Sequence, residues 1–440
     1  MVNTDRLYRN EGVGGNGHPV FTDVSSSAGV TYEGYGLGVA IADINQDNWP
    51  DIYVSNDYLS NDLLYINNRD GTGRQPAFDE QASEYLQHQS YSAMGNDVAD
   101  YNNDGRMDII TLDMLPPVNY RQKLMIGATN YNRYYSEQRA GYHPQFMRNT
   151  LQLHQGLNAR GEPHFSEIGQ LAGIHATDWS WSALWMDIDN DGWRDLTITN
   201  GYPRDITNRD FASYKMQEFQ QASYDATMQR RFMEALEGLE GAYLPNVVFQ
   251  NQGDLTFADR SKDWGFTQPS YSTGAAYADL DGDGDLDYVT NNTNAPAFLY
   301  ENKANERLDH HYLSIQLAGS ENNLRGIGTK VWCYGNGQIQ YTEHYPIRGF
   351  QSTVQAGVHF GLGDQAAVDS LIIRWPDGQR QTLRNIPADQ QVVVHYQDAS
   401  RMEEKAPLGT QRNLFQKSSP SFGLDFQHQE PHYNDFALQP

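Results

Sequence analysis

A nine-residue acidic loop occurs four times in this chain, each time between two short apolar segments. Every copy carries Asp or Asn at positions 1, 3, 5 and 9 of the loop. These residues are Asp43, Asn45, Asp47 and Asp51; Asp100, Asn102, Asp104 and Asp108; Asp187, Asp189, Asp191 and Asp195; and Asp279, Asp281, Asp283 and Asp287. Because the same loop returns in the same local context, the chain is a repeat protein in which each repeat supplies one small unit of the fold.

The spacing of these side chains predicts a site for a hard cation. Ca²⁺ accepts many oxygen ligands in a flexible geometry, so we expect up to four bound Ca²⁺ ions, with the backbone carbonyl of position 7 as a further ligand. Mg²⁺, which keeps more water, and a plain turn, in which Asp and Asn bond to their own backbone, are the alternatives. An EF-hand is excluded because position 12 is never Glu and strands flank the loop.

The four loops differ in charge. The third and fourth copies have four carboxylates at the ligand positions, whereas the first and second have three. We therefore expect tighter Ca²⁺ binding at the third and fourth loops. Position 6 requires a sharp turn with positive φ, which Gly105, Gly192 and Gly284 adopt easily and which Asn48 tolerates. The ion should brace the loop, so chelation should lower stability.

The segments around the loops predict short strands. An alternating segment such as 52–55 follows each loop, and a Leu-Tyr-x-Asn segment (64–67) and a Phe-x-Asp segment (78–79) follow the first copy. Four short strands per repeat indicate an all-β fold of β-propeller blades, which we assign to residues 1–305. Two longer gaps hold insertions after the second strand, at about 116–145 and 203–244, and the second has helical spacing of apolar residues.

Aromatic residues gather in and near these insertions. Consecutive turns of an up-and-down blade alternate between faces, so the insertions should project from the face opposite to the acidic loops. Exposed rings with polar neighbours suit stacking on sugar rings or anchoring a protein partner. The alternative is that these rings pack the insertions onto the blades. The candidate ligand-binding residues are Tyr131, Tyr134, Tyr135, Tyr142, Trp179 and Trp181.

Beyond the repeats, residues 309–397 predict a small β-sandwich with hairpin turns at Asn336-Gly337 and Asp377-Gly378. Residues 398–410 read as a linker, and 411–440 as the start of a further, truncated repeat. The segment 7–23 resembles the third and fourth strands of a blade whose first two are missing, so we expect a fragment of a longer protein. The alternative is that this segment completes the last blade and closes a four-bladed ring.

Composition limits the classes of function. The net charge of −25 disfavours nucleic acid, because phosphate contacts require clustered Lys and Arg. A single cysteine, Cys333, excludes an intramolecular disulfide. We expect no transmembrane segment, and no signal peptide begins the sequence. Asp-rich loops of this kind suit the higher Ca²⁺ outside the cell, so we expect an extracellular or outer-membrane surface protein whose signal was lost by truncation.

Several motifs resemble known families. The acidic loops, set in Phe-x-Asp-Val, Ala-Gly-Val and Ala-Asp-x-(Asn/Asp)-x-Asp segments, resemble the FG-GAP/VCBS repeats of integrin-α-type β-propellers. Residues 326–331, 348–352, 359–363, 368–371 and 375–378 resemble the ASPIC/UnbV domain. The combination is similar to the cartilage acidic protein family and its large bacterial members. The resemblance implies a secreted or surface-attached protein with a Ca²⁺-binding propeller, and in bacteria an association with outer-membrane nutrient uptake.

No serine-elbow, Walker, zinc-protease or Cys-x-x-Cys signature is present in the sequence, so we expect a protein that is not an enzyme. Three functions fit. The first is a binding or adhesion module for an unidentified glycan or protein ligand. The second is a structural accessory subunit of an outer-membrane nutrient-uptake complex. The third, a carbohydrate-active enzyme, would need a pair of carboxylates, and no pair stands out among so many Asp residues.

Overall fold

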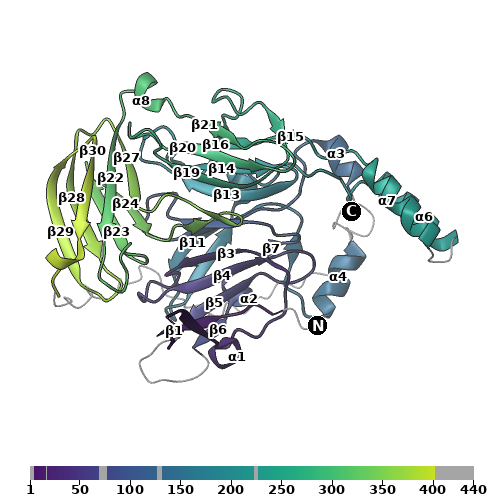
Figure 1. Cartoon of the computed structure of the whole chain (residues 1–440), viewed down its shortest axis with the longest axis horizontal. Coiled ribbons are helices and arrows are strands. Elements are labelled where there is room, and N and C mark those ends of the chain that lie inside the picture. Colours follow the sequence, from purple (N-terminus) through teal and green to yellow (C-terminus); the bar gives the residue numbers. More distant parts are fainter. Residues whose placement is uncertain (1–3, 16, 69–76, 126–130, 222–225, 402–440) are drawn as a thin grey trace, which may run out of the picture.

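The computed structural model of the chain describes residues 4–15, 17–68, 77–125, 131–221 and 226–401. It is mostly β, with many small antiparallel sheets and a few helices (Figure 1). Four of the sheets contain the acidic loops, and we call them repeat sheets 1 to 4. The remaining large sheets form a C-terminal domain.

Each repeat sheet runs up and down, with its strands paired in chain order. Sheet 1 contains β3 (Gly36–Ala42), β4 (Asp51–Asn56), β5 (Leu63–Asn67) and β6 (Phe78–Glu80). Sheet 2 contains β8 (Asn96–Ala99), β9 (Asp108–Thr111), β11 (Thr150–Leu157) and β12 (Pro163–Glu167). Sheet 3 contains β13 (Ser180–Met186), β14 (Asp195–Asn200), β16 (Val247–Asn251) and β17 (Phe257–Asp259). Sheet 4 has only β19 (Ser272–Ala278), β20 (Asp287–Asn292) and β21 (Phe298–Tyr300) among the described residues.

Neighbouring repeat sheets pack face to face, which buries both faces of the second strands. Every residue of β9 and β14 is buried, and for this reason these strands do not show the alternation of a half-exposed strand. In sheets 2 and 3 the phenylalanine of the fourth strand fills the space between two sheets. Phe165 lies in one buried cluster with Ile44, and Phe257 packs against the rings of Tyr101 and Trp185 at 5.6 and 5.8 Å.

The C-terminal domain consists of two facing sheets. One contains β27 (Val358–Gly363), β22 (His311–Ala318) and β30 (Gln390–His395), and the other β24 (Gln338–Glu343), β23 (Lys330–Gly335), β28 (Ala367–Arg374) and β29 (Arg380–Pro387). Side chains of both sheets, among them Leu313, Phe360, Val331 and Leu371, form one buried core. This is the arrangement of a sandwich. Its core is distinct from the clusters between the repeat sheets.

A hairpin of the C-terminal domain, β25 (Ile347–Arg348) and β26 (Ser352–Thr353), reaches the first strands of the repeat sheets. The Phe350 amide donates to Ser182 Oγ of β13 at 3.2 Å, and the Ala275 amide of β19 donates to Ser352 Oγ at 3.1 Å. Gly349 forms a β-bridge with Asn96 of β8. The C-terminal domain is therefore attached to several repeats at once.

The insertions lie on the side of the repeat sheets away from the C-terminal domain (Figure 1). The first contains α3 (Asn119–Leu124), α4 (Tyr131–Arg139) and β10 (Gln145–Phe146). The second, expected to be helical, contains α6 (Arg209–Gln221) and α7 (Ala226–Glu237). The guanidinium of Arg121 on α3 pairs with Asp178 at 2.7 Å and with Asp205 at 2.5 Å, which ties the two insertions together.

The segment near the amino end forms a two-stranded sheet, β1 (Tyr8–Val13) with β2 (Pro19–Asp23). Within the described ranges these strands pair only with each other, so the alternative in which they complete the last repeat sheet is wrong for this structure. The expected linker is described only up to residue 401, where Ser400 bridges to Arg380 of β29. The further repeat expected over 411–440 lies outside the described residues.

Candidate metal centres

Each acidic loop joins the first and second strands of its repeat sheet. The last residue of the first strand pairs with position 9 of the loop, as Ala42 does with Asp51 and Met186 with Asp195. Position 6 has positive φ in every copy, which confirms the prediction for Asn48 (75°) and Gly192 (93°). Position 4 also has positive φ, which the sequence reasoning missed. Its occupants are Gln46, Asn103, Asn190 and Gly282.

The carboxylate at position 1 organises the loop by accepting backbone amides. Asp43 accepts the Asn48 amide at 2.7 Å, and Asp187 accepts that of Gly192 at 2.9 Å. Position 5 adds a local turn, since Asp191 accepts the Trp193 amide at 2.8 Å. These bonds are of the kind made by plain Asx turns, so by themselves they do not distinguish a cation site from a turn.

Position 9 joins the loop to the third strand. One Asp195 oxygen accepts the Ile188 amide of the loop at 3.1 Å, and the other accepts the Asn251 amide at 2.9 Å. Asp51 and Asp287 make the equivalent pairs of bonds. In the second loop Asp108 Oδ1 accepts the His154 amide at 2.8 Å, whereas its Oδ2 is buried without a partner among the described residues. The bond to the third strand, which all four copies make, explains why Asp occupies position 9 in each of them.

The third loop has the features of a cation site that a turn does not require. Asp187, Asp189 and Asp195 are all buried, and one oxygen of each lies within 4.8 Å of the others. Among the described residues, Asp187 Oδ1 and Asp189 Oδ1 have no hydrogen-bond partner although both atoms are buried. A buried, unpaired carboxylate oxygen is unfavourable unless a cation meets it. This group could hold a metal ion.

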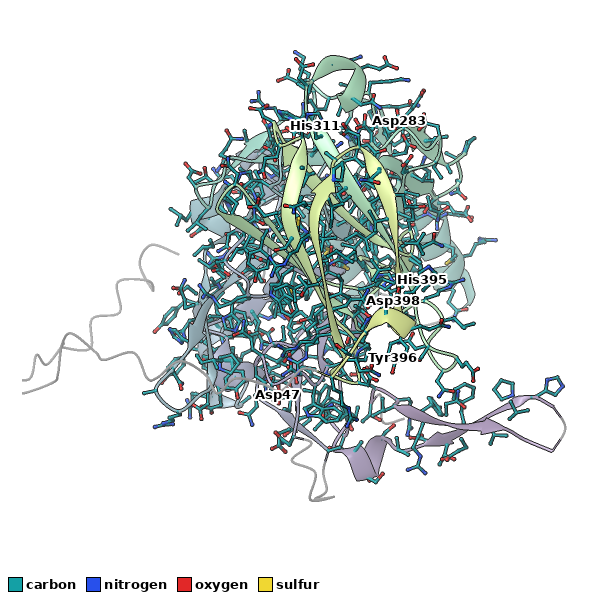
Figure 2. All side chains as sticks on the ribbon, turned by 90° about the vertical axis from the view of Figure 1, so that its left-hand side faces the viewer. Asp47, Asp283, His311, His395, Tyr396 and Asp398 are labelled. Carbon is teal, nitrogen blue, oxygen red and sulfur yellow. The ribbon has the colours of Figure 1, made fainter. Side chains whose placement is uncertain are left out.

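The fourth loop offers a second such group. Oxygens of Asp279, Asp281 and Asp283 lie within 4.8 Å of one another, in a more exposed setting. Figure 2 looks at the molecule from the side of the C-terminal domain and shows Asp283 near the upper end of this view and Asp47 of the first loop near the lower end. These two groups are the ones found among the described residues.

The first and second loops differ because Asn occupies position 3. The side-chain amide of Asn45 donates to Asp47 Oδ2 at 3.0 Å, and that of Asn102 donates to Asp104 Oδ2 at the same distance. The Asn thus satisfies a carboxylate that a cation would otherwise meet. This agrees with weaker cation binding at these two loops, which stays a prediction.

The C-terminal domain covers the loop side of the repeat sheets, a contact that sequence reasoning missed. The ammonium of Lys330 on β23 contacts Asp43 Oδ2, and Glu343 accepts the Asp43 amide at 3.0 Å. His359 Nε2 lies 2.7 Å from Asn190 Oδ1 in the third loop. Sequence spacing carries no signal for these pairs, because 287 and 169 residues separate their partners.

Burial shifts the acidity of the loop carboxyls. It raises the pKa of Asp51 and of Asp100 to about 7, in both cases with a further rise from neighbouring carboxylates. Burial and the Asp189 carboxylate raise the pKa of Asp191 to about 6. A metal-free loop therefore holds protons near neutral pH that a bound cation must displace.

We expect Ca²⁺ uptake to release protons at about pH 6.5 and to release few at about pH 8.5, where these groups are already ionised. Apparent Ca²⁺ affinity should rise between these two values. Affinity rises with pH because the metal-free fold stabilises the protonated carboxyls, as their raised pKa values show, and these protons must leave before the ion binds. Titration calorimetry in two buffers of different ionisation enthalpy measures the proton count. Equal heats in both buffers at the lower pH would contradict the expectation.

The predicted ligand-binding aromatics fall into two groups that differ in burial. Trp179 is 4% exposed, stacks on Tyr202 at 4.6 Å and donates from Nε1 to Asp205 at 3.3 Å, so its role as a ligand platform is wrong for this structure. Trp181 is partly buried against Phe350 at 5.2 Å. For these two rings the alternative, packing between insertion and repeat sheet, is the better description.

The tyrosines of the first insertion are more accessible. Tyr135 is 53% exposed and stacks on Tyr131, their ring centres 6.3 Å apart. Tyr134 is half-buried and stacks on Phe146 at 5.6 Å, and Tyr142 is half-buried. The structure thus leaves one exposed ring on α4, that of Tyr135, stacked on the half-buried Tyr131.

Comparison with known families agrees with this architecture. Residues 43–111 and 240–290 match the FG-GAP-like repeat, and residues 319–401 match the ASPIC and UnbV domain. No curated protein matches the chain. Within the described residues, no helix combines the length and the apolar character needed to cross a membrane. The chain therefore contains FG-GAP-like repeats and a C-terminal ASPIC/UnbV domain.

Proposed function

We propose that this chain is a non-enzymatic binding module whose repeat sheets are β-propeller blades stabilised by Ca²⁺. The observation that carries the proposal is the third loop, where oxygens of three buried Asp residues converge and one oxygen each of Asp187 and Asp189 is buried without a partner among the described residues. Oxygen-only donors in a loop with carboxylates and backbone carbonyls fit Ca²⁺. The first and second loops bind more weakly in this proposal, which gives up to four ions.

The ligand, a glycan or a protein, is contacted on the face opposite to the loops. The C-terminal domain already occupies the loop side through Lys330 and His359. The stacked pair of Tyr131 and Tyr135 on α4, in which Tyr135 is exposed and Tyr131 half-buried, offers rings suited to stacking on sugars. Loops of this kind require Ca²⁺ levels typical of extracellular modules, which supports a location at the cell surface or the outer membrane.

The test uses the full chain with 2 mM Ca²⁺ or with EDTA, against an array of polysaccharides. We expect binding that Tyr135→Ala reduces at least about tenfold, as the loss of an aromatic contact would. Tyr8→Ala is the matched control, because Tyr8 of β1 is similarly exposed at 56% and lies outside the insertions.

Three other outcomes would contradict the proposal. Absence of glycan binding together with co-purification of outer-membrane proteins would favour an accessory subunit of a nutrient-uptake complex. Turnover of a polysaccharide, abolished by one substitution outside the acidic loops, would make the chain an enzyme. Binding that Tyr135→Ala and Tyr8→Ala weaken equally would remove α4 from the ligand site.

A further inference from the structure

Within the described residues, repeat sheet 4 has three strands, whereas the other repeat sheets have four. In the described part of the chain, β21 is its last strand, and Leu299 on that edge is 64% exposed. After β21 the chain passes through α8 (Ala304–Arg307) into the C-terminal domain. An unpaired strand edge of this kind is a template for another strand.

The other repeat sheets define where the missing strand would pair. The phenylalanine of the fourth strand pairs with Asn67 in sheet 1, His154 in sheet 2 and Asn251 in sheet 3. Each of these three residues also donates its amide to position 9 of the preceding acidic loop. In sheet 4 that bond is made by Asn302, whose amide lies 2.9 Å from Asp287 Oδ1. Asn302 is therefore the position that a fourth-strand phenylalanine would face.

A cavity lies where that phenylalanine would be. It has a volume of about 400 Å³ and is lined mainly by apolar side chains, among them Met186, Ile188, Phe266, Tyr288 and Tyr300. Ile188 occupies position 2 of the third loop. In the first and second loops, the residue at position 2 packs with the fourth-strand phenylalanine of the next repeat sheet. Those earlier contacts are Ile44 with Phe165 and Tyr101 with Phe257.

The sequence beyond the C-terminal domain contains the missing pattern once. In β2 and in the fourth strands of sheets 2 and 3, a glycine stands eight residues after the phenylalanine and an apolar residue follows it: Phe21 with Gly29, Phe165 with Gly173, and Phe257 with Gly265. In sheet 1 the residue eight positions after Phe78 is Leu86. All three glycines have positive φ, between 81° and 90°. Phe415 has Gly423 and then Leu424 at the same spacing.

We propose that residues 415–417 add to β21 as the fourth strand of repeat sheet 4, with Phe415 opposite Asn302 and its ring in the cavity. The C-terminal domain is then an insertion between the third and fourth strands of that repeat. Phe415 lies 14 positions after Arg401 in the sequence, and an extended chain over that span reaches up to about 46 Å. One residue of the pattern differs. The third residue of the proposed strand is Lys417, whereas the other copies have Asp or Glu there, whose carboxylate accepts a backbone amide of the following turn.

The register gives a direct test by disulfide cross-linking in the full chain. Gln416 would lie opposite Glu301, as Ala258 lies opposite Gln250 in sheet 3. The double variant Glu301→Cys, Gln416→Cys should form an intramolecular disulfide under mild oxidation, while the native Cys333 is buried. Glu301→Cys with Gln427→Cys is the control and should stay reduced. A dimer linked between chains, or equal oxidation of both pairs, would overturn the proposal.

A second measurement does not depend on introduced cysteines. Phe415→Asp should speed amide exchange in β21 by at least about tenfold, because the strand would lose its partner and the cavity would be open to water. Phe436→Asp, in the same tail, should leave β21 unchanged. Unaltered exchange in Phe415→Asp would overturn the proposal, and neither result depends on whether the chain binds a glycan.

Discussion

Replacing Asp187 by asparagine is expected to lower Ca²⁺ affinity at the third loop by at least about 100-fold, the upper range for changes around a metal ligand. Asp187 Oδ1 is buried without a partner among the described residues, and an oxygen of Asp187 lies within 4.8 Å of oxygens of Asp189 and Asp195. A neutral side chain removes one of the charges that hold the ion.

The metal-free protein should respond differently to the same change. Burial and the neighbouring Asp191 and Asp189 raise the pKa of Asp187 well above its usual value, so the unliganded fold disfavours this charge. Asp187→Asn should therefore unfold in EDTA at the same temperature as the wild type or slightly higher. Ca²⁺ at 1,000 times the wild-type dissociation constant stabilises the fold by about 4 kcal/mol, so a 100-fold loss of affinity should remove at least about 2.7 kcal/mol of that in the variant.

Thermal unfolding with and without Ca²⁺ separates the two effects. Asp369→Asn is the matched control, because Asp369 is an exposed carboxylate on β28 and lies outside the loops. A variant that is destabilised equally in EDTA and in Ca²⁺ would show that Asp187 is only a turn residue. The same assay on Asp279→Asn, Asp43→Asn and Asp100→Asn tests the order of affinity, and the tightest site at the first loop would contradict it.

The parts of this site that could be predicted from the sequence depend on neighbours along the chain. The loop positions, the positive φ at Asn48 and Gly105, and the strands on either side all follow from spacing and backbone sterics within about ten residues. The side of the insertions follows from the alternation of turns in an up-and-down sheet. The loop features are local and recur in four copies, so the same prediction is made independently from each copy.

The parts that could not be predicted depend on tertiary packing. Lys330 meets Asp43 across 287 residues and Arg348 meets Asp97 across 251, and no periodicity in either segment marks them as partners. Trp179 is an aromatic residue with polar neighbours in the sequence, as exposed binding residues often are, but Tyr202 stacks on its ring. Whether a ring is buried depends on the side chains that pack on it in the folded protein, and the adjacent residues in the sequence do not predict these contacts.

Replacing Arg348 by methionine is expected to destabilise the protein by about 3–5 kcal/mol, as removal of one partner of a buried ion pair does. Arg348 belongs to the hairpin of the C-terminal domain that reaches the repeat sheets. Its Nε donates to Asp97 Oδ1 at 2.8 Å, another nitrogen donates to the Val98 carbonyl, and a third lies 3.3 Å from Tyr277 Oη. The Asp97 side chain is 2% exposed, so methionine would leave its charge buried and unpaired.

The loss should depend on pH in a defined direction. Burial already raises the pKa of Asp97 even though Arg348 lowers it, and removing the guanidinium would raise that pKa further. The variant should lose most stability at neutral pH, where Asp97 must ionise, and less as acid protonates it. The double variant Asp97→Asn, Arg348→Met should regain part of the stability at neutral pH, because no uncompensated charge remains.

Denaturant unfolding of the full chain at about pH 7 and about pH 5 measures both effects. Arg384→Met is the matched control, since Arg384 is an exposed arginine on β29 of the same domain. A loss below about 1 kcal/mol, the range of an exposed ion pair, would show that the hairpin is not anchored by Arg348. If the loss is as expected and the double variant recovers, the charge pair is what holds the ASPIC/UnbV domain against the first strands of the repeats. The insertion face would then be the side of the repeat sheets left open to a partner.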